Sequence, residues 1–127
     1  MSQFVKSFTL NRLAGADLSA KQFFIIKIST TNDKQVVLAA AGTDPIIGVL
    51  ENKPASGKAA AIQIGGTAKV IAGGTVTAGD LITSDSAGKG ITTVTDKNTI
   101  LGRALESAVV NDIFEVLLSP GAPPISQ

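Results

Sequence analysis

The chain has 127 residues, a length that suits one domain of ordinary size. It contains no cysteine and no histidine, which excludes a thiolate nucleophile, thiol redox chemistry, the usual zinc ligands and a histidine proton shuttle. Eleven Lys and Arg residues nearly balance ten Asp and Glu residues, no Trp or Tyr is present, and no apolar run approaches the roughly 20 residues that cross a bilayer, so we expect no nucleic-acid and no membrane partner.

Strand signals follow one another along the chain, beginning with two short β-rich runs over residues 23–29 and 34–40 that are separated by turn residues. In the next run, Ala60, Ile62 and Ile64 alternate and share one face, which places Gln63 on the other face. Residues 67–72 alternate in the same way, with Lys69 pointing to water. These patterns predict half-buried strands.

The second half of the chain continues the pattern. Residues 79–84 and 90–95 flank a predicted turn at 85–88, and residues 112–119 place Phe114, Val116 and Leu118 on one strand face. Residues 102–110 fit a short helix, a strand or an irregular crossing equally well. Helical periodicity is weak throughout, so the sequence predicts an all-β fold.

The two ends differ from the body of the chain. Residues 1–14 carry an apolar stripe and are expected to form an extended N-terminal arm, and residues 15–119 the β-rich domain. The Pro-rich residues 120–127 cannot join a central strand and are expected to form a flexible tail.

An internal repeat is the most informative feature. The stretch LSAKQFFI, from Leu18, matches VTAGDLIT, from Val76, at an offset of 58 residues. The stretch that begins PIIGVLE, from Pro45, matches the one that begins TILGRALE, from Thr99, at an offset of 54. The repeat predicts a compact β-barrel or sandwich built from two similar β units on one core.

The Gly-rich stretch VTAGDLITSDSAGKGI, residues 76–91, could hold a phosphate or a metal ion or could form an ordinary turn. A phosphate loop needs Gly-x-x-x-x-Gly-Lys-(Ser/Thr), but Thr83 and Gly90 break that spacing around Gly88-Lys89. The calcium-loop pattern is also absent around Asp80 and Asp85. We therefore interpret residues 85–88 as a type I turn that begins with Asp and ends with Gly.

Two further sets of residues are candidates for chemistry. Glu51 and Glu106 occupy similar positions in the repeat and could form an acid–base pair, although caps or ion pairs at strand ends explain them more simply. Lys58 and Lys89 lie on predicted turns and could carry a cofactor, but neither has the apolar flanks of a carrier lysine. The sequence therefore predicts no enzyme activity, no cofactor, no metal and no small-molecule substrate.

A longer stretch, VTAGDLITSDSAGKGITTVTDKNTILGRALESA followed by FEVLL, resembles the capsid decoration, or cement, proteins of tailed bacteriophages. The family pattern falls on residues 78–80, 85–89, 91–95, 102–106 and 114–118, within a likeness that covers about residues 15–118. A departure is Lys21-Gln22, which stands where Gly-Asp is expected.

The resemblance implies a virion protein, made in the host cytoplasm, that binds the outer surface of the capsid as a homotrimer on the major capsid protein. It also implies an N-terminal arm that reaches onto the capsid, for which the candidate contact residues are Phe4, Val5, Phe8 and Leu10. The alternatives are a phage tail or fibre component or another virion β module, a small non-enzymatic binding domain, and an enzyme or carrier that uses Lys58 or Lys89.

Overall fold

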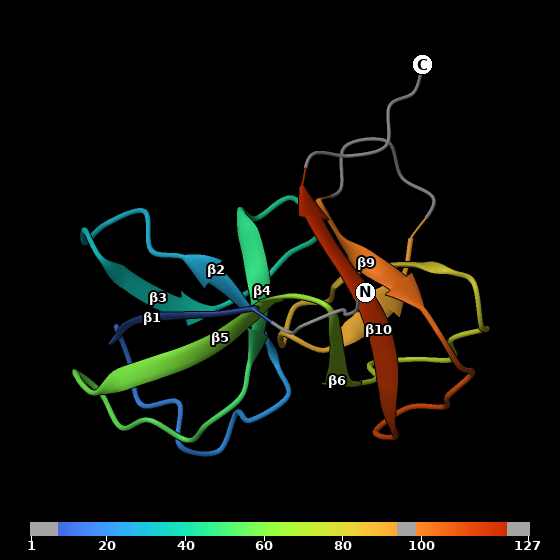
Figure 1. Ribbon diagram of the computed structural model, residues 1–127, viewed down its shortest axis with the longest axis horizontal. Coiled ribbons are helices and arrows are strands. Elements are labelled where there is room, and N and C mark those ends of the chain that lie inside the picture. The colour runs from blue at the N-terminus through green and yellow to red at the C-terminus, as the bar shows by residue number, and fades with distance from the viewer. Residues whose placement is uncertain (1–7, 94–98, 122–127) are drawn as a thin grey trace, which may run out of the picture.

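The computed structural model describes residues 8–93 and 99–121, and all the regular structure among them is β (Figure 1). The first five strands are β1 (Phe8–Ala14), β2 (Ile25–Ile28), β3 (Gln35–Leu38), β4 (Ile46–Leu50) and β5 (Ala59–Gly65). The next five are β6 (Thr67–Ile71), β7 (Leu81–Ser84), β8 (Gly90–Thr92), β9 (Ile100–Ala104) and β10 (Ile113–Gly121). The predicted all-β fold is confirmed.

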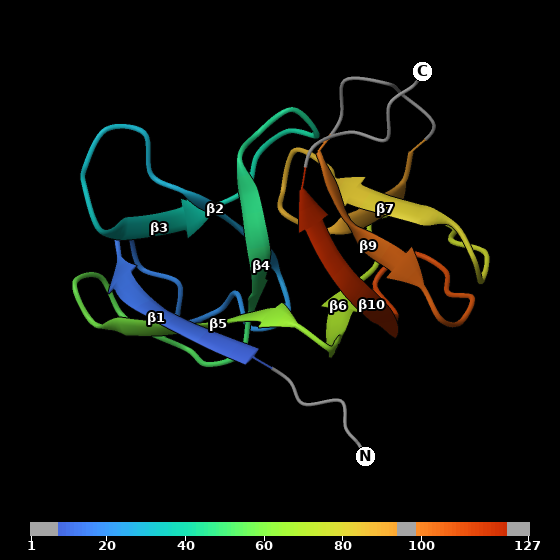
Figure 2. The same ribbon diagram turned by 45° about the horizontal axis from the view of Figure 1, so that its top comes forward.

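The strands form two units that lie side by side, as Figures 1 and 2 show. The first unit, β1–β5, is a closed barrel in the order β1-β3-β2-β4-β5. The second unit, β6–β10, is a sheet in the order β6-β10-β9-β7-β8, and a parallel bridge between Ala72 and Gly90 joins its two ends. Read as a ring, this order is the same in both units.

The strand registers match in detail, which confirms the predicted repeat. In the first unit Ile26 lies opposite Gly48, and in the second Ile82 lies opposite Gly102. The parallel pair of Ala14 with Val36 corresponds to the bridge that closes the second unit.

The register also corrects two of the predicted equivalences. Strands β2 and β7 are offset by 56 residues rather than 58. The residues at the place of Gly79-Asp80 are therefore Phe23-Phe24, two positions after the predicted Lys21-Gln22. The hydrogen bond from Glu51 N to Ala61 O corresponds to that from Leu105 N to Glu115 O, so Glu51 is equivalent to Leu105 and not to Glu106.

Two apolar clusters make up the core, and one of them spans both units. One fills the barrel of the first unit and includes Val36, Ala60 and Ile62. The other fills the second unit and extends across the junction, because Ile25 and Val49 of the first unit pack in the same cluster as Phe114. Burial of this apolar surface therefore stabilises both the second unit and its contact with the first.

Most of the predicted faces are correct, and one is wrong. Phe114, Val116 and Leu118 are buried on one face of β10, as expected. Gln63 is buried rather than exposed, because it lies at the junction of the two units, where its amide donates to the carbonyl oxygens of Gly65 and Thr67. The ambiguous stretch 102–110 begins as the end of β9 and continues as a loop.

The predicted domain boundaries need correction at both ends. Residues 8–14 form β1, which pairs with β5 and β3, so this segment belongs to the barrel and not to an arm. Strand β10 extends to Gly121, two residues into the expected tail. Residues 1–7 and 122–127 lie outside the described residues.

Candidate functional site

The four residues predicted to contact a partner do not form one site among the described residues. Phe4 and Val5 lie outside the described residues. Phe8 opens β1 opposite Gly65, and Leu10 pairs with Ile62 and is half-buried in the barrel wall. The alternating stripe is a strand signal, as the pairing of Phe8 and Leu10 with β5 shows.

The Gly-rich stretch is a hairpin turn, as predicted. The carboxylate of Asp85 accepts hydrogen bonds from the backbone N–H groups of Ala87 and Lys89 at 2.8 and 2.9 Å, and Gly88 adopts a left-handed φ of 82°. The turn also joins the two units, because Ile25 N donates to Gly88 O at 2.7 Å. Within residues 8–93 and 99–121, no group of three or more acidic side chains is placed to hold a metal ion.

The candidate catalytic residues make structural contacts. Glu51 accepts a hydrogen bond from the Thr9 hydroxyl at 3.2 Å, and Glu106 accepts one from Glu115 N at 3.0 Å. Lys89 donates to the Asn111 side chain at 2.9 Å, and Lys58 is exposed on a turn. The structure therefore gives neither pair an arrangement that points to acid–base or carrier chemistry.

A cavity of about 320 Å³ lies at the junction of the two units, beside Phe23. Its polar lining includes Glu51, Gln63, Lys69 and Glu115, and Lys69 pairs across the strands with Glu115. Phe23 has a φ of 74°, which bulky side chains rarely adopt, and its backbone is held by hydrogen bonds to Leu50 and Ile71. The cavity thus lies beside Phe23, whose backbone has an unfavourable φ at the junction of the two units.

The feature that sequence reasoning missed is an exposed apolar surface on the second unit. It comprises the outward side chains of β10 and of the loop before it: Leu105, Val109, Val110, Ile113 and Leu117. Val109 and Val110 are 55% and 54% exposed. The alternation that buries Phe114 necessarily turns Ile113 outward. The sequence therefore contained the information that Ile113 faces away from the core, although the strand analysis used only the buried face.

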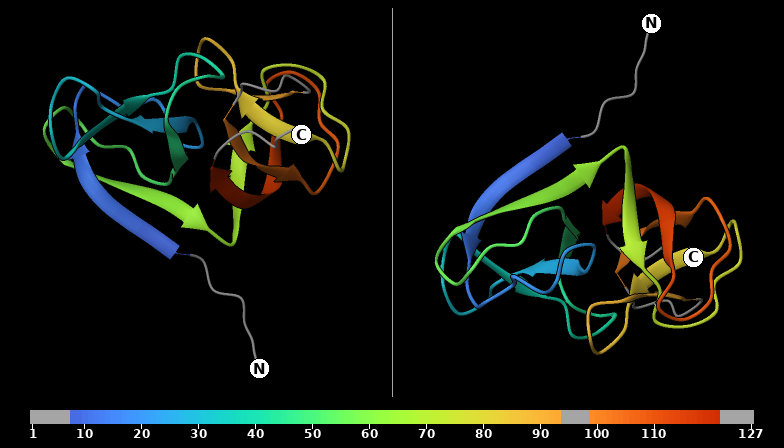
Figure 3. Two further views of the ribbon diagram at one scale, coloured as in Figure 1. Left: turned by 90° about the horizontal axis from the view of Figure 1, so that it is seen from above. Right: turned by 90° about the horizontal axis from the view of Figure 1, so that it is seen from below.

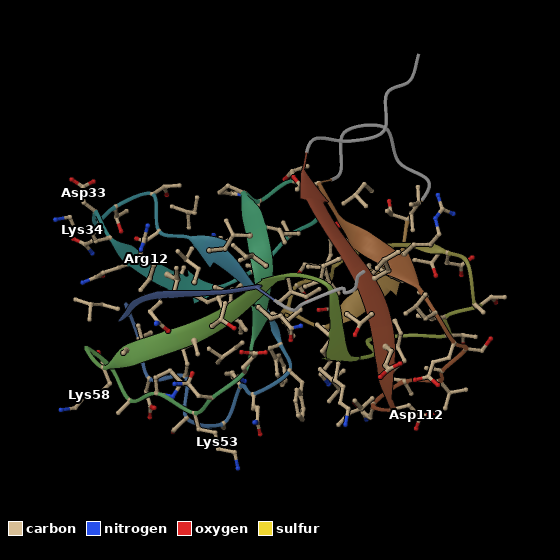
Figure 4. All side chains as sticks on the ribbon, viewed as in Figure 1. Arg12, Asp33, Lys34, Lys53, Lys58 and Asp112 are labelled. Carbon is tan, nitrogen blue, oxygen red and sulfur yellow. The ribbon has the colours of Figure 1, made fainter. Side chains whose placement is uncertain are left out.

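A smaller exposed apolar pair, Leu13 and Ile28, lies at the outer end of the first unit. Arg12 and Lys34 line both the hollow that includes Leu13 and the hollow that includes Ile28. Figure 4 shows Arg12 and Lys34 at this end of the molecule, and Asp112 at the opposite side, in the second unit. The molecule therefore has two separate apolar surfaces with different charged neighbours.

Three carboxylates have a lowered pKa for a clear physical reason, and the first is Asp17, which accepts hydrogen bonds from Ser19. The pKa of Asp80 is lowered by hydrogen bonds from Thr77 N at 2.9 Å and from the Thr92 hydroxyl at 2.8 Å. Burial raises the pKa of Asp44, but hydrogen bonds from Ala40 N and an ion pair with Lys27 at 3.3 Å outweigh it and leave the pKa lowered. The carboxylates of Asp44 and Asp80 both stabilise loops by accepting hydrogen bonds from nearby backbone N–H groups.

Among the described residues, no helix is long and apolar enough to cross a membrane. No curated protein matches the chain. Among solved structures, the fold is similar to that of the head fiber gp8.5 N base of bacteriophage phi29, with a TM-score of 0.70 and 18% sequence identity over 90% of this chain and 95% of that chain. At this identity the likeness shows the fold alone.

A protein-family model described as phage cement protein matches residues 8–118, from the first residue of β1 into β10. The match covers both units. The chain therefore belongs to the phage cement protein family, whose part in the phage virion is structural and capsid-stabilising.

Proposed function

We propose that this protein binds the outer surface of a phage head, contacts the major capsid protein and stabilises the assembled shell as a homotrimer. The single observation that carries the proposal is the family match over residues 8–118, which spans both units. In this proposal the protein is made in the host cytoplasm, catalyses no reaction and acts only through contacts in the virion.

The surface of the molecule supports a contact function. Exposed apolar side chains on the second unit, such as Val109 and Val110, are available to be buried against another protein. Burying a fully exposed side chain of this kind is worth roughly 1.5–3 kcal/mol, and a half-exposed one contributes about half of that. A trimer presents each contact three times, so weak single contacts can sum to stable attachment.

We keep Phe4 and Val5 as proposed capsid contacts. Phe8 and Leu10 stand in β1, where Leu10 is already half-buried. They stay proposed contacts too, but from the wall of the barrel rather than from an arm.

A second candidate function is the base of a fibre on the head. The fold shared with a head-fibre base favours it. Both functions place the protein on the head, and they differ in whether a projection rises from the bound protein.

Electron cryomicroscopy of heads that lack this protein, mixed with the purified chain, tests the proposal. We expect added density on the outer face where capsid subunits meet, and a higher temperature of head opening than for untreated heads. Heads that gain no density and open at the same temperature would refute capsid binding. A long projection from the added density would favour the fibre base.

A further inference from the structure

We infer that copies of this protein join head to tail, with the apolar face of the second unit of one copy docking on the outer end of the first unit of the next. The inference rests on the proposed function, because it names the surfaces that would build the homotrimer. The apolar face is the set Leu105, Val109, Val110, Ile113 and Leu117. The outer end is the set Leu13, Ile28, Arg12 and Lys34.

The internal repeat provides a matched comparison for the apolar face. Because β4–β5 and β9–β10 are offset by 54 residues, each apolar residue has an equivalent in the first unit. In the same order, these equivalents are Glu51, Ala55, Ser56, Ala59 and Gln63. Ala55, Ser56 and Ala59 are exposed like their counterparts, so the same fold forms with small or polar residues there. Val109, Val110 and Ile113 are therefore not needed for folding and indicate a partner, whereas Glu51 and Gln63 line the junction and give no such comparison.

The apolar face includes a tight turn just before β10. Residues 109–112 form a tight turn, closed by a hydrogen bond from Asp112 N to Val109 O at 3.0 Å, with Val109 and Val110 at its exposed side. The equivalent turn of the first unit, residues 55–58, has the same hydrogen bond at 3.0 Å but reads Ala-Ser-Gly-Lys. One unit therefore presents two valines on a fixed loop where the other presents alanine and serine.

The outer end of the first unit offers a hollow of suitable chemistry. A hollow of about 380 Å³ lies beside Leu13 and Ala59, with Arg12 and Lys34 at its edge. Strand pairing holds these residues together, since Leu13 N donates to Lys34 O at 3.2 Å. An apolar loop with acidic neighbours would fit such a site.

The charges of the two units are complementary. Residues 8–65 carry six Lys and Arg against four Asp and Glu, a net charge of +2. The described residues from 66 to 121 carry three Lys and Arg against five Asp and Glu, a net charge of −2. Glu106, Asp112 and Glu115 lie in or beside the apolar face together with the cations Lys69 and Arg103. Three acids against two cations leave one net negative charge to meet Arg12 and Lys34 of a second copy.

The placement of the two surfaces decides the kind of assembly. Figure 4 shows Arg12 and Lys34 at one end of the molecule and Asp112 on the other unit, and Figure 3 shows the two units side by side from above and from below. Two different surfaces on one chain give a head-to-tail contact, which closes into a ring when the rotation permits. A closed ring of three leaves neither surface uncovered.

A turn graft tests the apolar face. In the variant Val109→Ala, Val110→Ser, Asn111→Gly, Asp112→Lys, the turn receives the residues that the first unit already uses, so it should fold, as circular dichroism will check. We expect sedimentation equilibrium of the full chain to show an association constant at least about tenfold lower than for the parent. Unchanged association of the folded graft overturns the inference.

A charge exchange tests the choice of partner. Lys34→Glu should weaken self-association, whereas Lys53→Glu, at an exposed lysine that Figure 4 places away from Arg12 and Lys34, should not. Adding Asp112→Lys to Lys34→Glu in the same chain should restore association, because each contact again joins opposite charges. Equal effects of Lys34→Glu and Lys53→Glu, or no recovery in the double variant, contradict a docked second copy.

Head decoration, measured separately on the same variants, distinguishes this inference from the proposed function. A parent chain that decorates heads as a monomer overturns the inference and leaves capsid binding intact. A graft that loses decoration but keeps its association also overturns it, since the face then binds the capsid. A parent chain that forms a ring in solution, is dissociated by the graft, and does not bind heads supports the inference and refutes the proposed function.

Discussion

At the scale of single residues, four tight turns repeat one geometry. Residues 21–24, 55–58, 77–80 and 109–112 each close with a hydrogen bond of 3.0 Å from the fourth N–H to the first carbonyl. The third residue of each has a positive φ, at Phe23, Gly57, Gly79 and Asn111. A type II turn requires this conformation, which favours Gly or Asn, and Phe23 is the exception that packing at the junction maintains.

At Gly57 the free-energy cost of a left-handed φ for a residue with a side chain can be measured without any steric clash. A Cβ at Gly57 would meet no atom within 4 Å, so only the backbone opposes a side chain there. We expect Gly57→Ala to lower the free energy of unfolding by about 1 kcal/mol and Gly57→Asn to lower it by less, because Asn tolerates a left-handed φ. Urea denaturation measures both, and equal losses would contradict this account.

The lowered pKa of Asp80 predicts a pH dependence of stability. Since the folded-state pKa lies below the unfolded value of about 3.9, the ionised carboxylate stabilises the fold above that pH, and this contribution is lost as the pH falls through the folded pKa. Asp80→Asn should therefore lower the melting temperature at pH 6 by more than at pH 3.

Thr92→Val is the matched control for this prediction, because it removes one hydrogen bond to Asp80 and keeps the charge. It should reduce the melting temperature at pH 6 by less than Asp80→Asn does. A gap between the parent and Asp80→Asn that is the same at both pH values would refute the linkage.

At the scale of strands, the two units have the same backbone arrangement but place large and small side chains at different positions. A Cβ at Gly48 or at Gly102 would lie 2.1 Å from a carbonyl oxygen of the neighbouring strand, which explains why both repeats carry Gly there. Elsewhere the residues differ but compensate. Val36 and Ala60 pack together in the first unit, and their equivalents in the second are Gly90 and Phe114.

This exchange predicts strong coupling between Gly90 and Phe114. A Cβ at Gly90 would lie 3.3 Å from the Phe114 ring and 2.9 Å from Val70, so Gly90→Val should cost about 1–3 kcal/mol. Phe114→Ala should cost about 3–5 kcal/mol because Phe114 is fully buried. The double variant recreates the pair of the first unit and should be at least about 1 kcal/mol more stable than the sum of the two losses.

The control for this cycle combines Phe114→Ala with Val36→Ala, which lies in the separate cluster of the first unit. These two losses should add. Additive losses for Gly90→Val with Phe114→Ala, measured in the same urea series, would show that the two positions do not exchange volume.

At the scale of the whole molecule, the two units behave as one body around a shared apolar cluster. Ile25 and Val49 of the first unit are fully or almost fully buried in the cluster that contains Phe114. Backbone hydrogen bonds also cross the junction, from Ile71 N to Phe23 O and from Thr99 N to Gly42 O. A cement protein benefits from such a body, because rigid surfaces lose little entropy on binding.

Two N-terminal truncations separate the arm from the barrel. Deletion of residues 1–7 should leave the melting temperature nearly unchanged and weaken head binding if Phe4 and Val5 contact the capsid. Deletion of residues 1–13 should unfold the first unit, because it removes all but the last residue of β1, which closes the barrel. Thermal melts and head co-sedimentation measure both effects, and full decoration by the shorter deletion would refute the arm contact.

The sequence by itself determined the all-β class, the twofold repeat, the turn at residues 85–88 and the buried face of β10, because each depends on local periodicity or turn chemistry. Only the tertiary structure decided that Phe8 and Leu10 belong to the barrel, that Gln63 is buried, and that Val109 and Val110 form an exposed surface. The physical reason is that alternation shows which residues share a face of a strand, but what covers that face depends on strand pairing between residues far apart in the chain.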